Sequence, residues 1–273
     1  MHSKLAELIR ILDLEQIEQD IFRGYHPQGE TGRLYGGQIM AQALVAAGRT
    51  VPAARPPHSL HGYFLRPGDP AVPVLFMVER IRDGRSFSTR RIVVVQHGRA
   101  IFSMDASFQV VEAGLVHQAK MPDVQRPDDA RLARTNQDSH FLTYLMEYKA
   151  RLSRQPLPPR QHHWFCANGE MPDSEPLLHA ALLTFQSDSA LLSTSRLPHA
   201  DKFERKDMQS ASLDHAMWFH LPQARVDQWL LYALDAPQAA AARGFNRGQM
   251  FTEAGQLVAS TMQESLMRLR RNP

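Results

Sequence analysis

The order of expected elements in this chain occurs twice, and this repeat constrains the fold more than any other feature. In the first half an apolar helix precedes a run of strands, the last two of which meet at the turn His97-Gly98-Arg99. The helix is expected over 38–48 and the strands over 58–65, 72–81, 87–96 and 100–111, with a further helix over 3–18. This pattern is typical of an antiparallel sheet wrapped around one helix.

The second half repeats the same order. Its final hairpin turns at 252–255, and Arg243-Gly244-Phe245 matches Arg85-Ser86-Phe87 at the start of the equivalent hairpin. A strand is expected over 162–167, a helix over 176–195, and further strands over 211–219, 228–233, 241–251 and 256–267. The repeat therefore predicts two similar halves, each an α+β unit.

The stretch between the halves has a different composition. Prolines recur at 122, 127, 156, 158 and 159, and polar residues dominate between them. A modest helix is expected over 139–154. We interpret the chain as an N-terminal unit over 1–120, a linker over 121–160 and a C-terminal unit over 161–273 that carries the site.

Composition is that of an ordinary soluble globular protein, with 43% hydrophobic and 22% charged residues among 273. The net charge of +3 and the lack of a lysine- and arginine-rich tract argue against nucleic acid as a partner. Cys166 is the single cysteine, so no intrachain disulfide can form, and its Trp-Phe-Cys-Ala context favours a structural role over a nucleophilic one.

The sequence also bears on location. No secretory pattern begins the chain, and no stretch approaches the roughly 20 apolar residues of a membrane helix. The terminal Arg-Arg-Asn-Pro is not a peroxisomal Ser-Lys-Leu signal. A cytoplasmic protein with no membrane partner is the expectation.

Common catalytic motifs are missing. The sequence has no Gly-x-Ser-x-Gly elbow, no Walker loop, no Gly-x-Gly-x-x-Gly and no His-Glu-x-x-His. His58 and His61, three apart on a strand, would face opposite sides and could not chelate together. We therefore expect neither a metal nor a bound cofactor.

One acid in the second-half helix is the most informative residue. Helical spacing places Asp188 on the same apolar face as Leu177, Ala181, Thr184, Phe185 and Leu192. An ionised carboxylate on a buried face is costly without partners, and the first-half helix has no acid between Tyr35 and Thr50. Two interpretations stay open: a functional carboxylate, or an aspartate bonded to backbone or to the flanking Ser187 and Ser189.

Polar strand residues could complete such a site. Ser212 precedes the apolar stretch Leu-Asp-His-Ala-Met-Trp-Phe, and Gln263 lies near the middle of the final strand. Each alone is weak evidence, because a single Ser or Gln in a strand usually faces solvent. Asp214 and His215 suggest a rival acid–base pair, but adjacent strand residues point to opposite faces.

Several ordered blocks of sequence resemble the acyl-CoA thioesterase II family of bacterial and peroxisomal enzymes. The resemblance covers nearly the whole chain. The blocks are Phe22-Arg23-Gly24, Gly36-Gly37-Gln38, His58 to Asp69, Arg82 to Ser88, Ala167-Asn168-Gly169, Leu213 to His220 and Ala259 to Glu264. So many blocks in order are far more specific than any one short motif.

The resemblance implies a double-hotdog fold and hydrolysis of fatty acyl-CoA to free acid and CoA. In that family an Asp, a Thr and a Gln hold the attacking water, and no covalent intermediate forms. The Asp and Gln motifs match Asp188 and Gln263, whereas the Thr position is Ser212 here, which keeps the hydroxyl and loses a methyl. The resemblance also implies a homo-oligomer, a dimer or a tetramer.

Two alternatives remain. A hotdog enoyl-CoA hydratase would pair an Asp with a His on the same helix turn, and no His lies between Ala180 and Arg196. The other alternative is a non-catalytic protein that binds acyl-CoA.

Overall fold

The strands of the protein join into one antiparallel sheet. The computed structural model describes residues 3–27, 32–128, 136, 138–169, 171–172 and 175–270. Its elements are α1 (Ser3–Leu12), β1 (Glu15–Glu18), β2 (Ile21–Gly24), α2 (Gly36–Gly48), β3 (Pro57–Phe64), β4 (Val74–Asp83), β5 (Phe87–Gln96), β6 (Arg99–Gln109), β7 (Phe141–Leu145), α4 (Tyr148–Leu152), β8 (Arg160–Ala167), α5 (Pro176–Ser187), α6 (Leu191–Thr194), β9 (Met208–Ser212), β10 (Asp214–Phe219), β11 (Leu230–Ala240), β12 (Arg243–Thr252) and β13 (Leu257–Leu269), with short 3₁₀ turns at Leu197–His199 and Arg205–Asp207.

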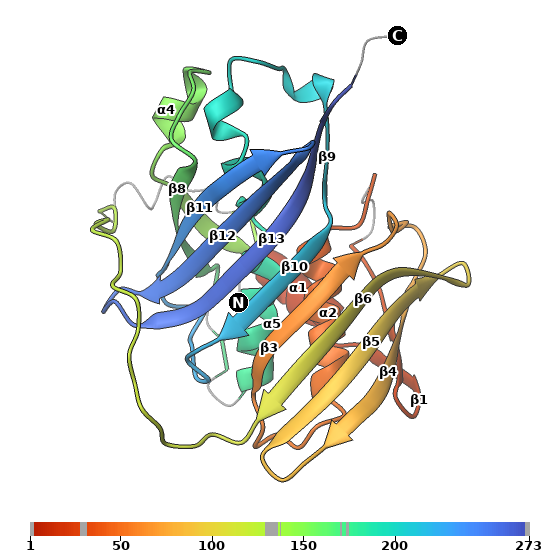
Figure 1. Ribbon diagram of the computed structural model, residues 1–273. Coiled ribbons are helices and arrows are strands. Elements are labelled where there is room, and N and C mark those ends of the chain that lie inside the picture. The colour runs from red at the N-terminus through yellow and green to blue at the C-terminus, as the bar shows by residue number, and fades with distance from the viewer. Residues whose placement is uncertain are drawn as a thin grey trace.

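The two halves of the sheet meet at its centre. The strand order is β1-β2-β4-β5-β6-β3-β10-β13-β12-β11-β8-β7, and β9 also pairs with β13. Antiparallel pairing of β3 with β10, with Leu60 opposite Met217, joins the halves. Figure 1 shows this sheet curving in front of α2 and α5. Each half thus supplies one central helix, α2 or α5, and one set of strands, as the repeat in the sequence predicts.

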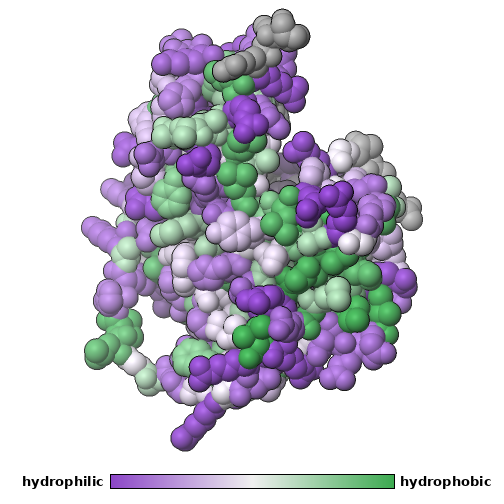
Figure 2. All heavy atoms as spheres, turned by 45° about the vertical axis from the view of Figure 1, so that its right-hand side comes forward, coloured by the Kyte–Doolittle hydropathy of each residue, from purple (hydrophilic) through white to green (hydrophobic). Residues whose placement is uncertain are grey.

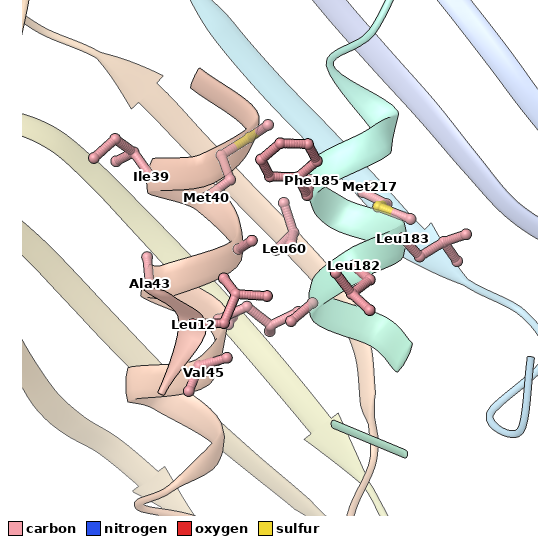
Figure 3. Packing of buried hydrophobic residues seen from close by; sticks show 14 of the residues in the cluster. Leu12, Ile39, Met40, Ala43, Val45, Leu60, Leu182, Leu183, Phe185 and Met217 are labelled. Carbon is pink, nitrogen blue, oxygen red and sulfur yellow. The ribbon is translucent and has the colours of Figure 1, made fainter. Parts of the chain in front are cut away.

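The two central helices pack against each other in opposite directions. A Cβ on Gly37, at the start of α2, would lie 2.3 Å from the carbonyl oxygen of Phe185 near the end of α5. At the other end, a Cβ on Gly48 would lie 2.6 Å from the Leu177 side chain. Figure 3 shows apolar side chains from both helices, including Met40 and Phe185, meeting in the core. Small residues along α2 permit this close approach.

Two of the predicted helices are replaced partly or largely by strands. The helix expected over 3–18 ends at Leu12, and Glu15–Glu18 forms β1, which pairs with β2. The helix expected over 139–154 is instead β7 followed by the short α4, because the aromatic and β-branched run Phe141–Leu145 pairs along β8.

The helix expected over 176–195 is interrupted. It ends at Ser187, and Ala190 adopts a left-handed backbone with φ 70° before α6 begins. An alanine in that conformation gives no sequence signal, since glycine or asparagine usually fills it. Asp188 is therefore the residue that caps α5, not one within a longer helix. The strand expected over 211–219 is likewise two strands, β9 and β10, separated by Leu213.

The surface bears on the expected partners. Figure 2 shows hydrophobic side chains gathered over strands of the first half, where β4 exposes Leu75, Met77 and Ile81. Contiguous exposed apolar side chains are typical of interaction surfaces.

The homo-oligomer stays a prediction, as does the division of the chain into units at 1–120, 121–160 and 161–273. Among the described residues, no helix is long and apolar enough to cross a membrane.

Candidate active site

Asp188 lies where the end of α5 meets the start of α2. Its Oδ2 accepts a hydrogen bond from the Gly37 backbone N–H at 3.0 Å. The carboxylate thus faces the positive end of the α2 dipole, which stabilises its charged form. Of the two interpretations left open by the sequence, a carboxylate bonded to its own flanking serines does not match these contacts, because the backbone partner comes from the other half.

Glycines at the start of α2 make this approach possible. A Cβ on Gly36 would lie 2.8 Å from Asp188 Oδ2, and one on Gly37 would also clash with the Tyr35 ring at 2.6 Å. Tyr35 itself donates from Oη to the Phe185 carbonyl oxygen at 3.0 Å. The Gly36-Gly37 pair therefore sets the distance between the two helix ends.

We expect Gly37→Ala to lower both stability and turnover, because the added methyl must push α2 away from α5 and from Asp188. Overpacking of this kind costs about 1–3 kcal/mol of unfolding free energy. Gly114→Ala is the matched control, since a Cβ there meets nothing within 4 Å. Urea unfolding and thioester hydrolysis measure the two effects. Wild-type stability and activity in Gly37→Ala would contradict this tight contact.

The structure brings Ser212 and Gln263 to Asp188. Ser212, the last residue of β9, donates from Oγ to Asp188 Oδ1 at 3.4 Å, a long hydrogen bond. Gln263 of β13 donates from Nε2 to Ser212 Oγ at 3.0 Å and to Ser265 Oγ at 3.1 Å. Gln263 is buried, with 1% of its surface exposed. The three residues singled out in the sequence thus form one hydrogen-bonded chain.

His215 is a fourth member of this cluster, which the sequence interpretation considered only as a partner of Asp214 and set aside. Its Nδ1 lies 2.8 Å from Gln263 Oε1, and its Nε2 lies 2.9 Å from Ser187 Oγ. Asp214 points the other way and accepts from the Glu264 backbone N–H at 2.6 Å, so Asp214 and His215 do not meet. The sequence does carry a signal for His215. It occupies one of the alternating positions of β10 whose side chains are buried.

The chemistry of the partners fixes the direction of these hydrogen bonds. An amide oxygen only accepts, so His215 Nδ1 carries the hydrogen that Gln263 Oε1 receives. That contact turns the Gln263 amide nitrogen toward Ser212 Oγ, whose own hydrogen then points at Asp188. The chain of donors therefore ends at the carboxylate. On its other side, His215 Nε2 contacts the hydroxyl of Ser187, the residue before Asp188.

Burial governs the ionisation of the two titratable members. It raises the pKa of Asp188 above its ordinary value, while a charged His215, the Gly37 N–H and the Ser212 hydroxyl lower it. Burial also lowers the pKa of His215, against the attraction of Asp188. A raised pKa makes the Asp188 carboxylate a stronger proton acceptor than an exposed aspartate.

A cavity of about 320 Å³ opens beside the cluster, and both Gly36 and Ser212 line it. Most of its other walls are apolar, from Leu34, Ile39, Phe64, Ile101 and Phe102, with Arg33 and Arg66 also lining it. A concave, mostly apolar space beside a few polar groups is typical of a small-molecule site.

The first half has no equivalent carboxylate. The residue that caps α2 is Arg49, whose guanidinium binds Asp13 and the Leu14 carbonyl.

Within the described ranges, no three His, Cys, Asp or Glu side chains come close enough together to hold a metal ion. Cys166 is buried, which raises the pKa of its thiol to about 12 and disfavours the nucleophilic thiolate.

Comparison with known proteins identifies the family. A model of the acyl-CoA thioesterase family matches residues 134–266, and one of the acyl-CoA thioesterase N-terminal domain matches 25–109. Acyl-coenzyme A thioesterase 8 of Mus musculus is 40% identical over 95% of this chain and 88% of that protein. Acyl-CoA thioesterase 2 of Haemophilus influenzae is 37% identical over 98% of this chain and 99% of its own. The chain belongs to the acyl-CoA thioesterase family.

Solved structures agree with this identification. An acyl-CoA thioesterase II from Mycobacterium marinum is 41% identical, covers 98% of this chain and all of its own, and superimposes with a TM-score of 0.84. A hotdog-fold protein from Alicyclobacillus acidocaldarius, 17% identical over 97% of this chain and 99% of its own, has a TM-score of 0.78 and shows the fold alone. The predicted double hotdog and thioester hydrolase are confirmed.

Proposed function

We propose that this thioesterase hydrolyses fatty acyl-CoA to free fatty acid and CoA, with Asp188 as the general base. The observation that carries the proposal is the position of Asp188, between the start of α2 and the Ser212–Gln263 chain, beside an apolar cavity. Acyl-CoA supplies an apolar chain that suits such a cavity, and a thioester carbon that water can attack.

In the proposed reaction Asp188 takes a proton from a water molecule whose oxygen attacks the thioester carbonyl carbon. Ser212 Oγ and Gln263 Nε2, which are 3.0 Å apart, orient that water by hydrogen bonding, with the amide exchanging its bond to Ser265 Oγ for one to the water. The tetrahedral intermediate then collapses, the C–S bond breaks, and the proton held by Asp188 passes to the leaving sulfur. No bond forms between substrate and enzyme.

The negative charge that develops on the carbonyl oxygen needs donors. The first turn of α2 is suited to this, because its N–H groups point out of the helix and Gly36 lines the cavity. Gly37 N–H is already bonded to Asp188, so Gly36 N–H is the better placed of the two. The Gln263 amide could serve as a donor only by giving up its bond to Ser265 Oγ, and that hydrogen would then not orient the water.

Ser212→Ala should lower kcat about tenfold, because the water loses one orienting group while the base remains. The loss should be smaller than that of Asp188→Asn. Ser212→Thr, which keeps the hydroxyl, is the matched control and should retain most activity. Release of free thiol from palmitoyl-CoA measures both variants. A larger loss in Ser212→Ala than in Asp188→Asn would make the hydroxyl, not the carboxylate, the main actor.

One assay separates the thioesterase from the two alternatives. Wild-type protein incubated with acyl-CoAs of several chain lengths and a thiol reagent should release CoA. Hydration of an enoyl-CoA without thiol release would favour the hydratase, although both ring nitrogens of His215 are engaged by Gln263 and Ser187 rather than by Asp188. Binding without either reaction would favour the non-catalytic protein.

A further inference from the structure

Among the described strands, β9 has a partner on one edge only, and its other edge lies at the cavity. On its other side β9 pairs with β13, Ser212 opposite Ser265. The neighbouring strand β3 reaches only as far as Phe64, whose N–H bonds to the Leu213 carbonyl oxygen. Beyond that point no residue in the described part of the chain pairs with this edge of β9, and the cavity lining includes Ser210, Ala211 and Ser212.

The backbone groups of two serines point toward this free edge. The Asp207 carbonyl accepts from Arg270 N–H at 2.7 Å, and Leu213 N–H donates to the Glu264 carbonyl at 2.9 Å, so both odd-numbered residues face β13. Backbone groups alternate in direction along a strand. The N–H and C=O groups of Ser210 and Ser212 therefore face away from β13, toward the cavity.

The Ser210 hydroxyl is a second, independent observation. Its Oγ is buried and has no hydrogen-bond partner among the residues that the structure describes, although Ser210 lines the cavity. Nearly all buried polar atoms are hydrogen-bonded, since leaving one unpaired costs free energy. Ser212, two residues along and roughly 7 Å away by strand geometry, has its hydroxyl bonded to Asp188. An unpaired hydroxyl beside unpaired backbone groups indicates a polar ligand.

We propose that the free edge of β9 binds the pantetheine arm of coenzyme A, with Ser210 Oγ bonded to one of its amides. The inference rests on the proposed function. The arm is an extended chain whose first amide lies two carbons from the thioester sulfur, and extended amides bind free strand edges through backbone hydrogen bonds. With the thioester at Ser212, the arm runs along β9 past Ser210. A fatty acyl chain has no group that could pair with this edge.

Ser210→Ala tests the proposal, with fatty acyl-CoA compared against the same acyl group on 2-mercaptoethanol, which has no amide. We expect kcat/KM for acyl-CoA to fall about five- to tenfold, mainly through KM, and to be unchanged for the amide-free thioester. Because Ser210 Oγ bonds to none of the described residues, the variant should unfold at the wild-type temperature or higher. Ser103→Ala, outside the cavity, is the control.

Proline substitutions test the backbone part of the proposal. Ser210→Pro removes an N–H that faces the free edge, so it should weaken acyl-CoA binding with little loss of stability. Ala211→Pro removes an N–H that faces β13 and should destabilise the protein. Equal losses on both thioesters in Ser210→Ala, or no loss on either, would overturn the proposal. If wild-type protein turned over neither thioester, the proposed function itself would fail.

Discussion

Asp188→Asn should lower kcat by two to four orders of magnitude, the usual contribution of a general base. Asparagine keeps an oxygen that can accept the Gly37 N–H, so the junction between α2 and α5 should persist. It cannot take a proton from water. Thiol release from palmitoyl-CoA measures the loss, and wild-type turnover by this variant would refute the role of Asp188.

The same variant should not be less stable at neutral pH. Because burial raises the pKa of Asp188 above its ordinary value of 3.8, the folded protein keeps this proton at pH values where the unfolded chain has lost it. Stability from this group is thus greatest at low pH and falls as the pH rises from 3.8 through the folded pKa. Asparagine avoids that cost, so thermal unfolding should occur at or above the wild-type temperature.

Activity should respond to pH in the opposite sense. Only ionised Asp188 accepts a proton, so kcat/KM of the wild type should fall as the pH is lowered through the folded pKa. Asp214→Asn is the matched control, because Asp214 is the rival acid and points away to the Glu264 N–H. It should keep the wild-type pH profile. A profile that changed in Asp214→Asn and not in Asp188→Asn would reverse the assignment.

His215→Leu should lower kcat about 30- to 100-fold with a smaller effect on KM. We propose His215 as a positioning residue, since its Nδ1–H holds Gln263 Oε1 and thereby turns the amide nitrogen toward Ser212. Without that donor the Gln263 amide can rotate. The buried oxygen left unpaired should also cost about 1–3 kcal/mol of unfolding free energy.

The matched variant is His215→Asn, whose side-chain nitrogen can replace Nδ1. It should recover most of kcat even though it loses the contact with Ser187. This rescue separates positioning from a general packing effect, which would follow side-chain volume instead. Equal losses in His215→Leu and His215→Asn, at wild-type unfolding temperature, would contradict positioning through Gln263.

The sequence predicted the parts of the fold that depend on periodicity and turn chemistry. The helix expected over 38–48 and the strand expected over 87–96 lie within two residues of α2 and β5. Elements fixed by tertiary contacts were missed or misjudged. The run 141–145 becomes β7 because β8 offers an edge to pair with, and a left-handed backbone at Ala190 separates α5, which ends at Ser187, from α6.

The residues of the candidate site likewise differ in how far the sequence predicts them. Asp188 was visible as an acid among apolar residues at helical spacing, whereas Ser212 and Gln263 rested on resemblance to a family. His215 was set aside because Asp214 faces the other way, yet its partners come from α5 and β13. Local alternation gives the face of a strand, but only the packing of distant elements determines which groups meet there.

Single-turnover hydrolysis of palmitoyl-CoA in ¹⁸O-labelled water, with enzyme in excess, tests the role of Asp188 most directly. If Asp188 activates water, one labelled oxygen enters the fatty acid in the first turnover, and the peptide that contains Asp188 stays unlabelled. An unlabelled fatty acid, or label in the Asp188 carboxylate, would show that the carboxylate attacks the thioester itself and would contradict the proposed mechanism.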